Sequence, residues 1–170
     1  DSLEYFYSKN DVINMIPFLL VKNNIDKMNI LITPMDDNAY YILVDDCRKD
    51  LKSLINDGFK PCLYQSTSWN SYQSVFKLPK KYDREKEVLP LFNGMNKSFG
   101  DEKMTGLRHP FRLAGFRNMK PKHERENGTR PFVSIELAIN RFCSKCIDMI
   151  DRRRKEFINQ KKITKNDLSI

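Results

Sequence analysis

The strongest constraint on the fold is a set of short segments rich in β-branched and aromatic residues in the first half of the chain. "NILITP" (29–34) and "AYYILV" (39–44) flank the turn-prone "MDDN", so we expect them to pair as antiparallel strands. "KPCLYQSTS" (60–68) and "SYQSVFKLP" (71–79) read as two more strands on either side of "WN". Between the two pairs, "CRKDLKSLIND" (47–57) has the apolar spacing of a helix. The order strand, strand, helix, strand, strand predicts an α+β fold, with an antiparallel sheet and helices packed on one face.

Further helices are expected on both sides of these strands. Ser8 or Asn10 can cap a first helix whose apolar residues recur on one face, and Pro17 is expected to kink or split it. The pattern is helical again over residues 84–99. A last helix is expected to begin near Pro131, a favourable first-turn residue, and to run into the basic "RRRKEFINQKK". That basic end is either an arm for nucleic acid or favourable charge at a helix terminus.

The chain of 170 residues is long enough for one domain with a substantial core. We predict a sheet domain over residues 1–125 and a basic C-terminal helical extension over residues 126–170, packed on the same domain. The stretch from 100 to 130 reads as extended loop, with one short strand at "FRLAG" (111–115). Because the sequence has no initiator Met and starts inside a segment that reads as structured, we expect it to be part of a larger polypeptide.

Positive charge is concentrated in the second part of the chain. Residues 1–102 hold 13 Lys and Arg against 15 Asp and Glu, whereas residues 103–170 hold 17 against 7. This asymmetry is typical of a protein that binds a polyanion along one side, and nucleic acid is the expected partner. The alternative is a solvated basic surface that keeps the protein in solution, and charge alone does not decide between the two.

Several classes of site are missing from the sequence. His109 and His123 are the only histidines and do not form a pair, which disfavours enzymes that hold a metal with a histidine cluster. A P-loop nucleotide hydrolase is excluded because no phosphate-cradling Gly-rich stretch is present. Cys143 and Cys146 lack a second pair for a zinc site, so we expect them in the core. No apolar run reaches the roughly 18 residues of a membrane span, and the four cysteines require no disulfides, so we expect a cytoplasmic protein without membrane contact.

Two adjacent acids, Asp45 and Asp46, end the apolar run 40–44. Desolvation and mutual repulsion both oppose two charges at the end of a buried strand. One explanation is a turn, in which Asp side chains cap local backbone groups. The other is a divalent cation. Adjacent residues of a regular strand face opposite ways, so the two acids can share a site only if the strand ends or bulges there.

Two more stretches have unusual composition, "TSWNSYQ" (67–73) and "FGDEKMTGLRHPFRLAGFRNMKPK" (99–122). With the two acids they form three motifs whose order and spacing resemble the RepB-type primases of plasmids, a branch of the archaeo-eukaryotic primase superfamily. The resemblance covers roughly residues 28–122. The matching residues are Ile42, Leu43, Val44, Asp45 and Asp46; Thr67, Ser68, Tyr72 and Gln73; and Gly100, Asp101, Arg108, Arg112, Leu113, Gly115, Phe116, Asn118 and Lys120.

The resemblance implies a primase catalytic domain, built on a sheet like that of the RNA-recognition motif, that makes primers from nucleoside triphosphates on single-stranded DNA with Mg²⁺ or Mn²⁺. Asp45, Asp46 and Asp101 would be the catalytic metal ligands, with a two-metal site expected because two ions can both activate the attacking hydroxyl and neutralise the triphosphate. Plasmid replication is the expected setting. A fused or associated helicase, relaxase or replication initiator is an expected partner.

The other predicted contacts follow from the second and third motifs. Residues expected to bind the nucleotide are Ser68, Gln73, His109, Arg112, Asn118 and Lys120. Residues expected to bind DNA are Tyr72, Arg108, Arg117 and Lys122. Tyr64, Trp69, Tyr72 and Phe116 can all stack on bases, but large aromatics in a small domain are usually core, so at most one is expected to do so.

Two other functions stay open at this point. A replication initiator or DNA-binding module can keep the sheet without the chemistry. A relaxase or nuclease would cut the strand that a primase copies. A hydroxyl-rich hairpin at 67–73 can also simply satisfy its own backbone.

Overall fold

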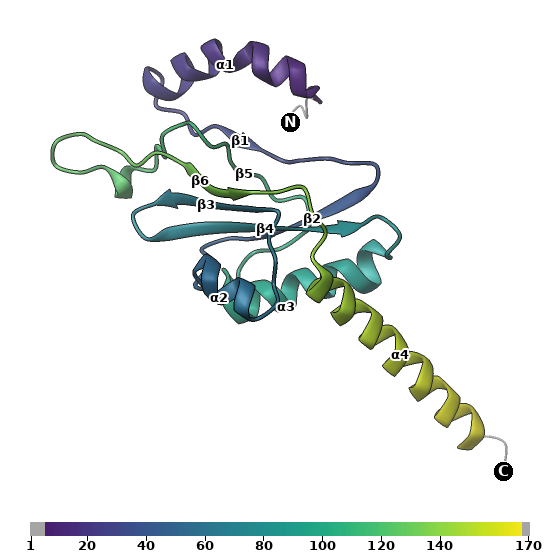
Figure 1. Cartoon of the computed structure of the whole chain (residues 1–170). Helices are drawn as coiled ribbons and strands as arrows, with labels where there is room; N and C mark the ends of the chain where they lie inside the picture. The colour runs from purple at the N-terminus through teal and green to yellow at the C-terminus, as the bar shows by residue number, and fades with distance from the viewer. Residues whose placement is uncertain (1–5, 168–170) are drawn as a thin grey trace.

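The computed structural model describes residues 6–167, and its centre is a four-stranded antiparallel sheet (Figure 1). The strands, in spatial order, are β2 (Ala39–Val44), β4 (Ser71–Pro79), β3 (Leu63–Ser68) and β6 (Ser134–Ala138). A two-residue turn joins β3 to β4, and its second residue, Asn70, has a left-handed φ of 62°, which Asn adopts more readily than most residues. The sheet confirms the predicted α+β class with antiparallel strands.

A second, two-stranded ribbon lies over the main sheet. β1 (Leu31–Ile32) pairs with β5 (Phe111–Arg112), so the expected pairing of residues 29–34 with residues 39–44 is wrong. The turn residues between these two segments do change the chain direction, but they do not determine which strand pairs with β1. The returning segment at 111–112 takes that place instead. The ribbon lies on the face of the sheet opposite α2 and α3 (Figure 1).

The helices α2 (Leu51–Asn56) and α3 (Leu89–Phe99) cover the other face of the sheet (Figure 1). A π-helical turn, Arg84–Val88, leads into α3 within the predicted helical stretch. The carboxylate of Asp83 caps this turn by accepting from the amides of Glu85 and Lys86. The core lies between these helices and the sheet, and its fully buried members include Ile42, Val44, Leu54, Val75, Phe76, Leu78, Val88, Leu91 and Phe92.

The first helix, α1 (Lys9–Asn24), stands apart from the sheet (Figure 1). Ser8 and Asp11 form a capping box at its start, in which each side chain accepts from the other's backbone amide. α1 continues through Pro17, so the helix is not split there. Its one buried residue is Asn23, at the end that approaches the rest of the molecule.

The last helix, α4 (Ser144–Asp167), begins later than the predicted start near Pro131. Residues 134–138 form β6 instead, because their apolar positions also fit the alternation of a strand and the edge of β3 offers a partner. The predicted division after residue 125 stays a prediction, but the segment beyond it supplies both a strand of the main sheet and a helix. Cys143 and Cys146 are fully buried, as predicted. Among the described residues, no helix has the length and apolar character needed to cross a membrane.

Candidate active site

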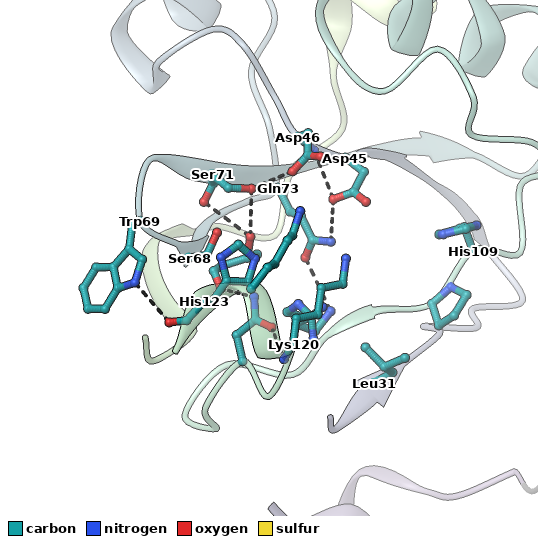
Figure 2. Close-up of a pocket in the computed structure, with 15 residues that line it drawn as sticks. Leu31, Asp45, Asp46, Ser68, Trp69, Ser71, Gln73, His109, Lys120 and His123 are labelled. Atoms are coloured by element: carbon teal, nitrogen blue, oxygen red, sulfur yellow. Dashed lines mark hydrogen bonds between the residues drawn. The ribbon is translucent and has the colours of Figure 1, made fainter. Parts of the chain in front are cut away.

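A pocket of about 280 Å³ opens where β2 ends, between the β3–β4 hairpin and the segment 109–123 (Figure 2). Its walls are polar, with carboxylates, hydroxyls and cations from four separate parts of the sequence. The lining residues are Leu31, Asp45, Asp46, Thr67, Ser68, Trp69, Ser71, Gln73, His109, Pro110, Arg112, Asn118, Lys120, Lys122 and His123.

Most of the predicted site residues meet in this pocket. The structure brings together Asp45, Asp46, Ser68, Gln73, His109, Arg112, Asn118, Lys120 and Lys122. Four others, Tyr72, Asp101, Arg108 and Arg117, are not on its wall. The order of the three motifs along the chain therefore predicted a real convergence in space, but not every member of each motif takes part.

The two adjacent acids share the pocket because the strand stops before them. β2 ends at Val44, and Asp46 has a left-handed φ of 44°, which re-aims its side chain. Oδ1 of Asp45 accepts from Nε2 of Gln73 at 2.8 Å and from the Asp46 amide at 3.0 Å. Oδ1 of Asp46 accepts from the Ser71 hydroxyl at 2.6 Å. Each carboxylate is thus fixed through one oxygen, as the dashed lines in Figure 2 show.

Asp101 is close to Asp45 through its backbone rather than through its carboxylate. The Asp101 amide donates to the carbonyl of Asp45 at 2.8 Å, while Oδ1 of Asp101 accepts from the Lys103 amide at 2.9 Å and closes a turn. Within the described part of the chain, no three His, Cys, Asp or Glu side chains are grouped to hold a metal ion. The predicted cluster of three carboxylates is therefore not assembled in this structure, whereas the pair Asp45 and Asp46 is.

A network of buried side-chain amides holds Asp45 in place. Gln65, which is 1% exposed, donates through Nε2 to Oε1 of Gln73 at 2.9 Å and to the carbonyl of Arg112 at 2.8 Å. These bonds orient the Gln73 amide so that its Nε2 points at Asp45. Gln73 lines the pocket, and its amide positions Asp45. Its expected contact with the nucleotide stays a prediction.

Cationic side chains face the carboxylates across the pocket. Arg112 is 9% exposed, its Nη1 contacts Oδ1 of Asn29, and burial lowers its pKa while Asp45 and Asp46 act in the opposite direction. Lys120 and Lys122 extend from the following loop and are exposed. This arrangement suits an anion that carries several phosphates, since the guanidinium is fixed and the ammonium groups can adjust.

Asn118 links the basic segment to the hairpin. Its Nδ2 donates to the carbonyl of Thr67 at 2.8 Å, and its Oδ1 accepts from the Lys120 amide at 3.2 Å. The side chain is buried, so it holds the pocket wall together as well as lining it. Ser68, also buried, lies at a β-bulge that interrupts the pairing of β3 with β4.

The predicted DNA contacts are dispersed. Tyr72 stacks on Tyr64 with ring centroids 5.3 Å apart. Arg117 donates to the carbonyl of Arg130 and covers the ring of Phe132 at 4.1 Å, so it serves the packing of the loop. Arg108 is exposed outside the pocket, and Lys122 lines it.

Among the lining residues that sequence reasoning missed, Ser71 and His123 carry polar side chains. Ser71 follows the hairpin turn directly, so its pairing with Ser68 could have indicated a second hydroxyl beside Asp46. The pKa of His123 is lowered by burial and then by Lys122, Lys120 and Arg112. His123 follows Lys120 and Lys122 closely in the sequence, and this position was the signal that could have placed it in the pocket.

The fold and the pocket together define an α+β domain with paired carboxylates and a basic wall, a combination that suits phosphate-bearing substrates. The model of the RepB DNA-primase N-terminal domain matches residues 10–163, and the chain belongs to this family. The family predicted from the three motifs is therefore confirmed.

Two relatives each match about three quarters of this chain. The chain is 35% identical over 136 residues to a DNA primase of Acidithiobacillus ferrooxidans, covering 78% of this chain and 38% of the relative. It is 29% identical over 131 residues to mobilization protein A of Escherichia coli, covering 76% of this chain and 18% of the relative. The chain thus spans well under half the length of either relative.

Two solved structures share the fold. The crystal structure of primase RepB′ matches with a TM-score of 0.71 and 21% identity, over 96% of this chain and 57% of that one. The catalytic domain of RepB′ in complex with initiator DNA matches with the same TM-score and identity, over 92% of this chain and 80% of that one. At 21% identity, the similarity to these two structures shows that the chain shares their fold.

Proposed function

We propose that this chain is the catalytic domain of a DNA primase, which joins nucleoside triphosphates into short primers on single-stranded DNA by metal-dependent nucleotidyl transfer. The observation that carries the proposal is the pocket in which Asp45 and Asp46 face Arg112, Lys120 and Lys122. Phosphoryl transfer is catalysed mainly by positioning and by charge stabilisation, and this pocket offers groups for both. Membership of the RepB primase family supports the same activity.

Asp45 and Asp46 are the residues proposed to hold Mg²⁺ or Mn²⁺. Their chemistry fits, because Mg²⁺ is commonly bound by one or two carboxylates together with substrate phosphates rather than by a complete protein cage. The amide of Gln73 and the hydroxyl of Ser71 fix one oxygen of each carboxylate. When bound, such an ion would neutralise phosphate charge and lower the pKa of the attacking hydroxyl.

The third carboxylate, Asp101, keeps its proposed metal role only if its side chain leaves the turn with Lys103. The backbone bond to Asp45 already places Asp101 next to a residue of the pocket wall. Binding of the two proposed cations would favour that rotation, since they would attract a further carboxylate.

The basic wall is proposed to bind the triphosphate. Arg112, whose backbone is held by the Gln65 network, would contact one phosphate in a fixed geometry. Lys120 and Lys122 would follow the remaining charge, and the hydroxyl of Ser68 can donate to a phosphate oxygen. His109 lines the same pocket and is proposed as a further contact to the nucleotide.

Single-stranded DNA is the proposed template. The solved relative that carries initiator DNA supports a DNA partner, and so does the excess of basic residues after position 102. Lys122 is the predicted DNA contact that the pocket retains. Arg108 is exposed and can extend the contact along the strand.

The test is primer synthesis on single-stranded DNA with labelled nucleotides and Mn²⁺. We expect di- and oligonucleotides from the parent, and a loss of at least about a hundredfold in the Asp45→Asn and Asp46→Asn variants, because each removes a charge from the proposed metal site. Asp37→Asn is the matched control, since Asp37 is an exposed acid outside the pocket.

The rival functions give different results in the same assay. Binding of the template without any synthesis by the parent would favour a non-catalytic replication module. Cleavage of the strand would favour a relaxase or nuclease. Equal synthesis by the Asp45→Asn and Asp37→Asn variants would overturn the proposed metal site.

A further inference from the structure

The structure separates the four aromatic residues that the sequence offered as stacking platforms. Tyr64 is 1% exposed and Phe116 is 5% exposed, so neither can receive a base. Tyr72 packs against Tyr64 and is not on the pocket wall. Trp69 lines the pocket and is 46% exposed. Of the four, Trp69 has the position and the exposure that a stacking residue needs.

Trp69 is held in a fixed orientation at the hairpin turn. It is the first residue of the two-residue connection between β3 and β4, so its backbone is fixed by the strands on both sides. Its indole Nε1 donates to the carbonyl of His123 at 3.3 Å, which ties the ring to the basic loop (Figure 2). A large apolar ring kept exposed in a fixed place is unusual for a residue that serves packing alone.

One face of the indole is already covered by a cation. The guanidinium carbon of Arg125 lies 3.7 Å from the ring centroid, within cation–π distance. Arg125 lies over one face, and the residue is still 46% exposed, so a further ring could stack only on the side that Arg125 does not cover. A base placed there would form the third layer of an Arg125–Trp69 stack.

The loop that carries Arg125 is itself constrained. The Arg125 amide donates to the carbonyl of Thr129 at 2.9 Å, and the Gly128 amide donates to the carbonyl of Arg125 at 2.8 Å. Gly128 has the left-handed φ of 76° that such a tight turn requires. An ion pair between Arg130 and Glu124 closes the base of the turn. Arg125 is therefore presented to the indole by a defined turn.

We propose that the face of Trp69 opposite Arg125 is a stacking site for a nucleobase at the edge of the pocket. This inference deepens the proposed function and rests on it, since the base belongs to a nucleotide whose phosphates reach the neighbouring cations. Lys122 and His123 line the same pocket as the indole, and the His123 carbonyl accepts the indole hydrogen bond. Every nucleobase has a π-face, so the site would accept any base, as a primase that copies varied sequences requires.

The base has two possible sources, the single-stranded template and the incoming nucleoside triphosphate. Both present the same stacking chemistry. A titration can separate them, because Trp69 is the one tryptophan in the sequence and its fluorescence reports the site directly. Stacking of a base on an indole quenches this fluorescence.

The experiment follows tryptophan fluorescence of the full chain without metal and without synthesis, so it does not depend on catalytic activity. In one arm, a single-stranded oligonucleotide is compared with an abasic strand of the same length and charge. In the other arm, a nucleoside triphosphate is compared with inorganic triphosphate. Quenching by the base-bearing member of one pair alone identifies the source of the base and supports the stacking site.

Two variants complete the test, and their binding is measured by isothermal titration calorimetry alongside the parent because neither variant contains a tryptophan. Trp69→Leu is expected to weaken binding of the base-bearing ligand by about 5- to 150-fold, the range for one stacked base, while its binding of the ligand without bases stays unchanged. Trp69→Phe keeps an aromatic face and is expected to recover most of that affinity. The proposal is overturned if neither arm gives base-dependent quenching, or if Trp69→Leu binds both members of each pair as the parent does. Lost primer synthesis with normal quenching would instead count against the proposed function.

Discussion

At the scale of single residues, the site depends on amides that hold charged groups in place. Gln65 orients Gln73, and Gln73 holds one oxygen of Asp45. Such buried polar chains are stable only when every member is satisfied, because an unpaired buried amide costs about 1–3 kcal/mol. The sequence indicated that Gln73 belonged to the site, but it could not show which atom the amide faces.

His123 provides a prediction about pH. Burial and the neighbouring Lys122, Lys120 and Arg112 lower its pKa below the ordinary value of about 6.5. We expect an NMR titration to show a midpoint below that of a free imidazole, and binding of a triphosphate to raise it, because the anion offsets the nearby cations.

The sign of the effect on stability follows from the same shift. The unfolded chain takes up a proton at a higher pH than the folded chain, so this imidazole favours folding above its ordinary pKa and the contribution declines as the pH falls. The His109→Gln variant leaves a single imidazole signal and assigns it. A midpoint that does not move when triphosphate is added would contradict the placement of His123 in a phosphate site.

At the scale of elements, the junction between α3 and β2 decides where the two acids lie. Asn96 on α3 donates to the carbonyl of Leu43 at 2.9 Å, and its Oδ1 accepts from the Asp45 amide at 3.3 Å. Gly100 ends the helix against the same strand. A Cβ at Gly100 would lie 2.6 Å from Oδ1 of Asn96 and from a methyl group of Val44. The close approach therefore requires a glycine.

We predict that Gly100→Ala lowers the free energy of unfolding by about 1–3 kcal/mol, because buried neighbours must move to admit the methyl group. Gly94→Ala in the same helix is the matched control. Its added Cβ would meet only the end of the Arg153 side chain at 3.8 Å, so we expect a gain of about 0.5–1 kcal/mol from helix propensity. Urea denaturation of both variants measures the two changes. Equal effects would contradict this account of the junction.

Elements with a local sequence pattern could be predicted, whereas elements that form by pairing with a distant segment could not. The hairpin of β3 and β4 follows from two apolar runs on either side of a two-residue turn. β1 and β6 were misassigned because their partners lie about 80 and 70 residues away in sequence, where pattern reasoning has no information. The turn that holds the carboxylate of Asp101 is a local exception, because a contact only two residues along the chain replaces the predicted metal contact in this structure.

At the scale of the whole molecule, the N-terminal segment braces the pocket from outside. Oδ1 of Asn23 accepts from the Arg117 amide and its Nδ2 donates to the Arg117 carbonyl, so the side chain pairs with the loop as a strand would. Oδ1 of Asn29 accepts from the Met119 amide at 2.8 Å. Two asparagines thus fix the segment that carries the basic wall.

The predicted division after residue 125 can be tested by truncation. A chain ending at residue 125 would lack β6 and the buried side chains of Cys143, Cys146 and Ile150, which belong to the main core. We expect this fragment to lose its cooperative unfolding transition, because the edge of β3 and the core beneath it would be exposed. Circular dichroism during heating measures this. A fragment as stable as the parent would show that the first part is an independent unit.

The position of β6 also has a consequence for synthesis on the ribosome. β2, β3 and β4 are translated long before residues 134–138, which pair with β3. Until that late segment leaves the exit tunnel, the nascent chain carries an unpaired strand with free amides and carbonyls. Slow translation just before this point would prolong that state, so the timing of elongation bears on how much of the protein reaches its native form.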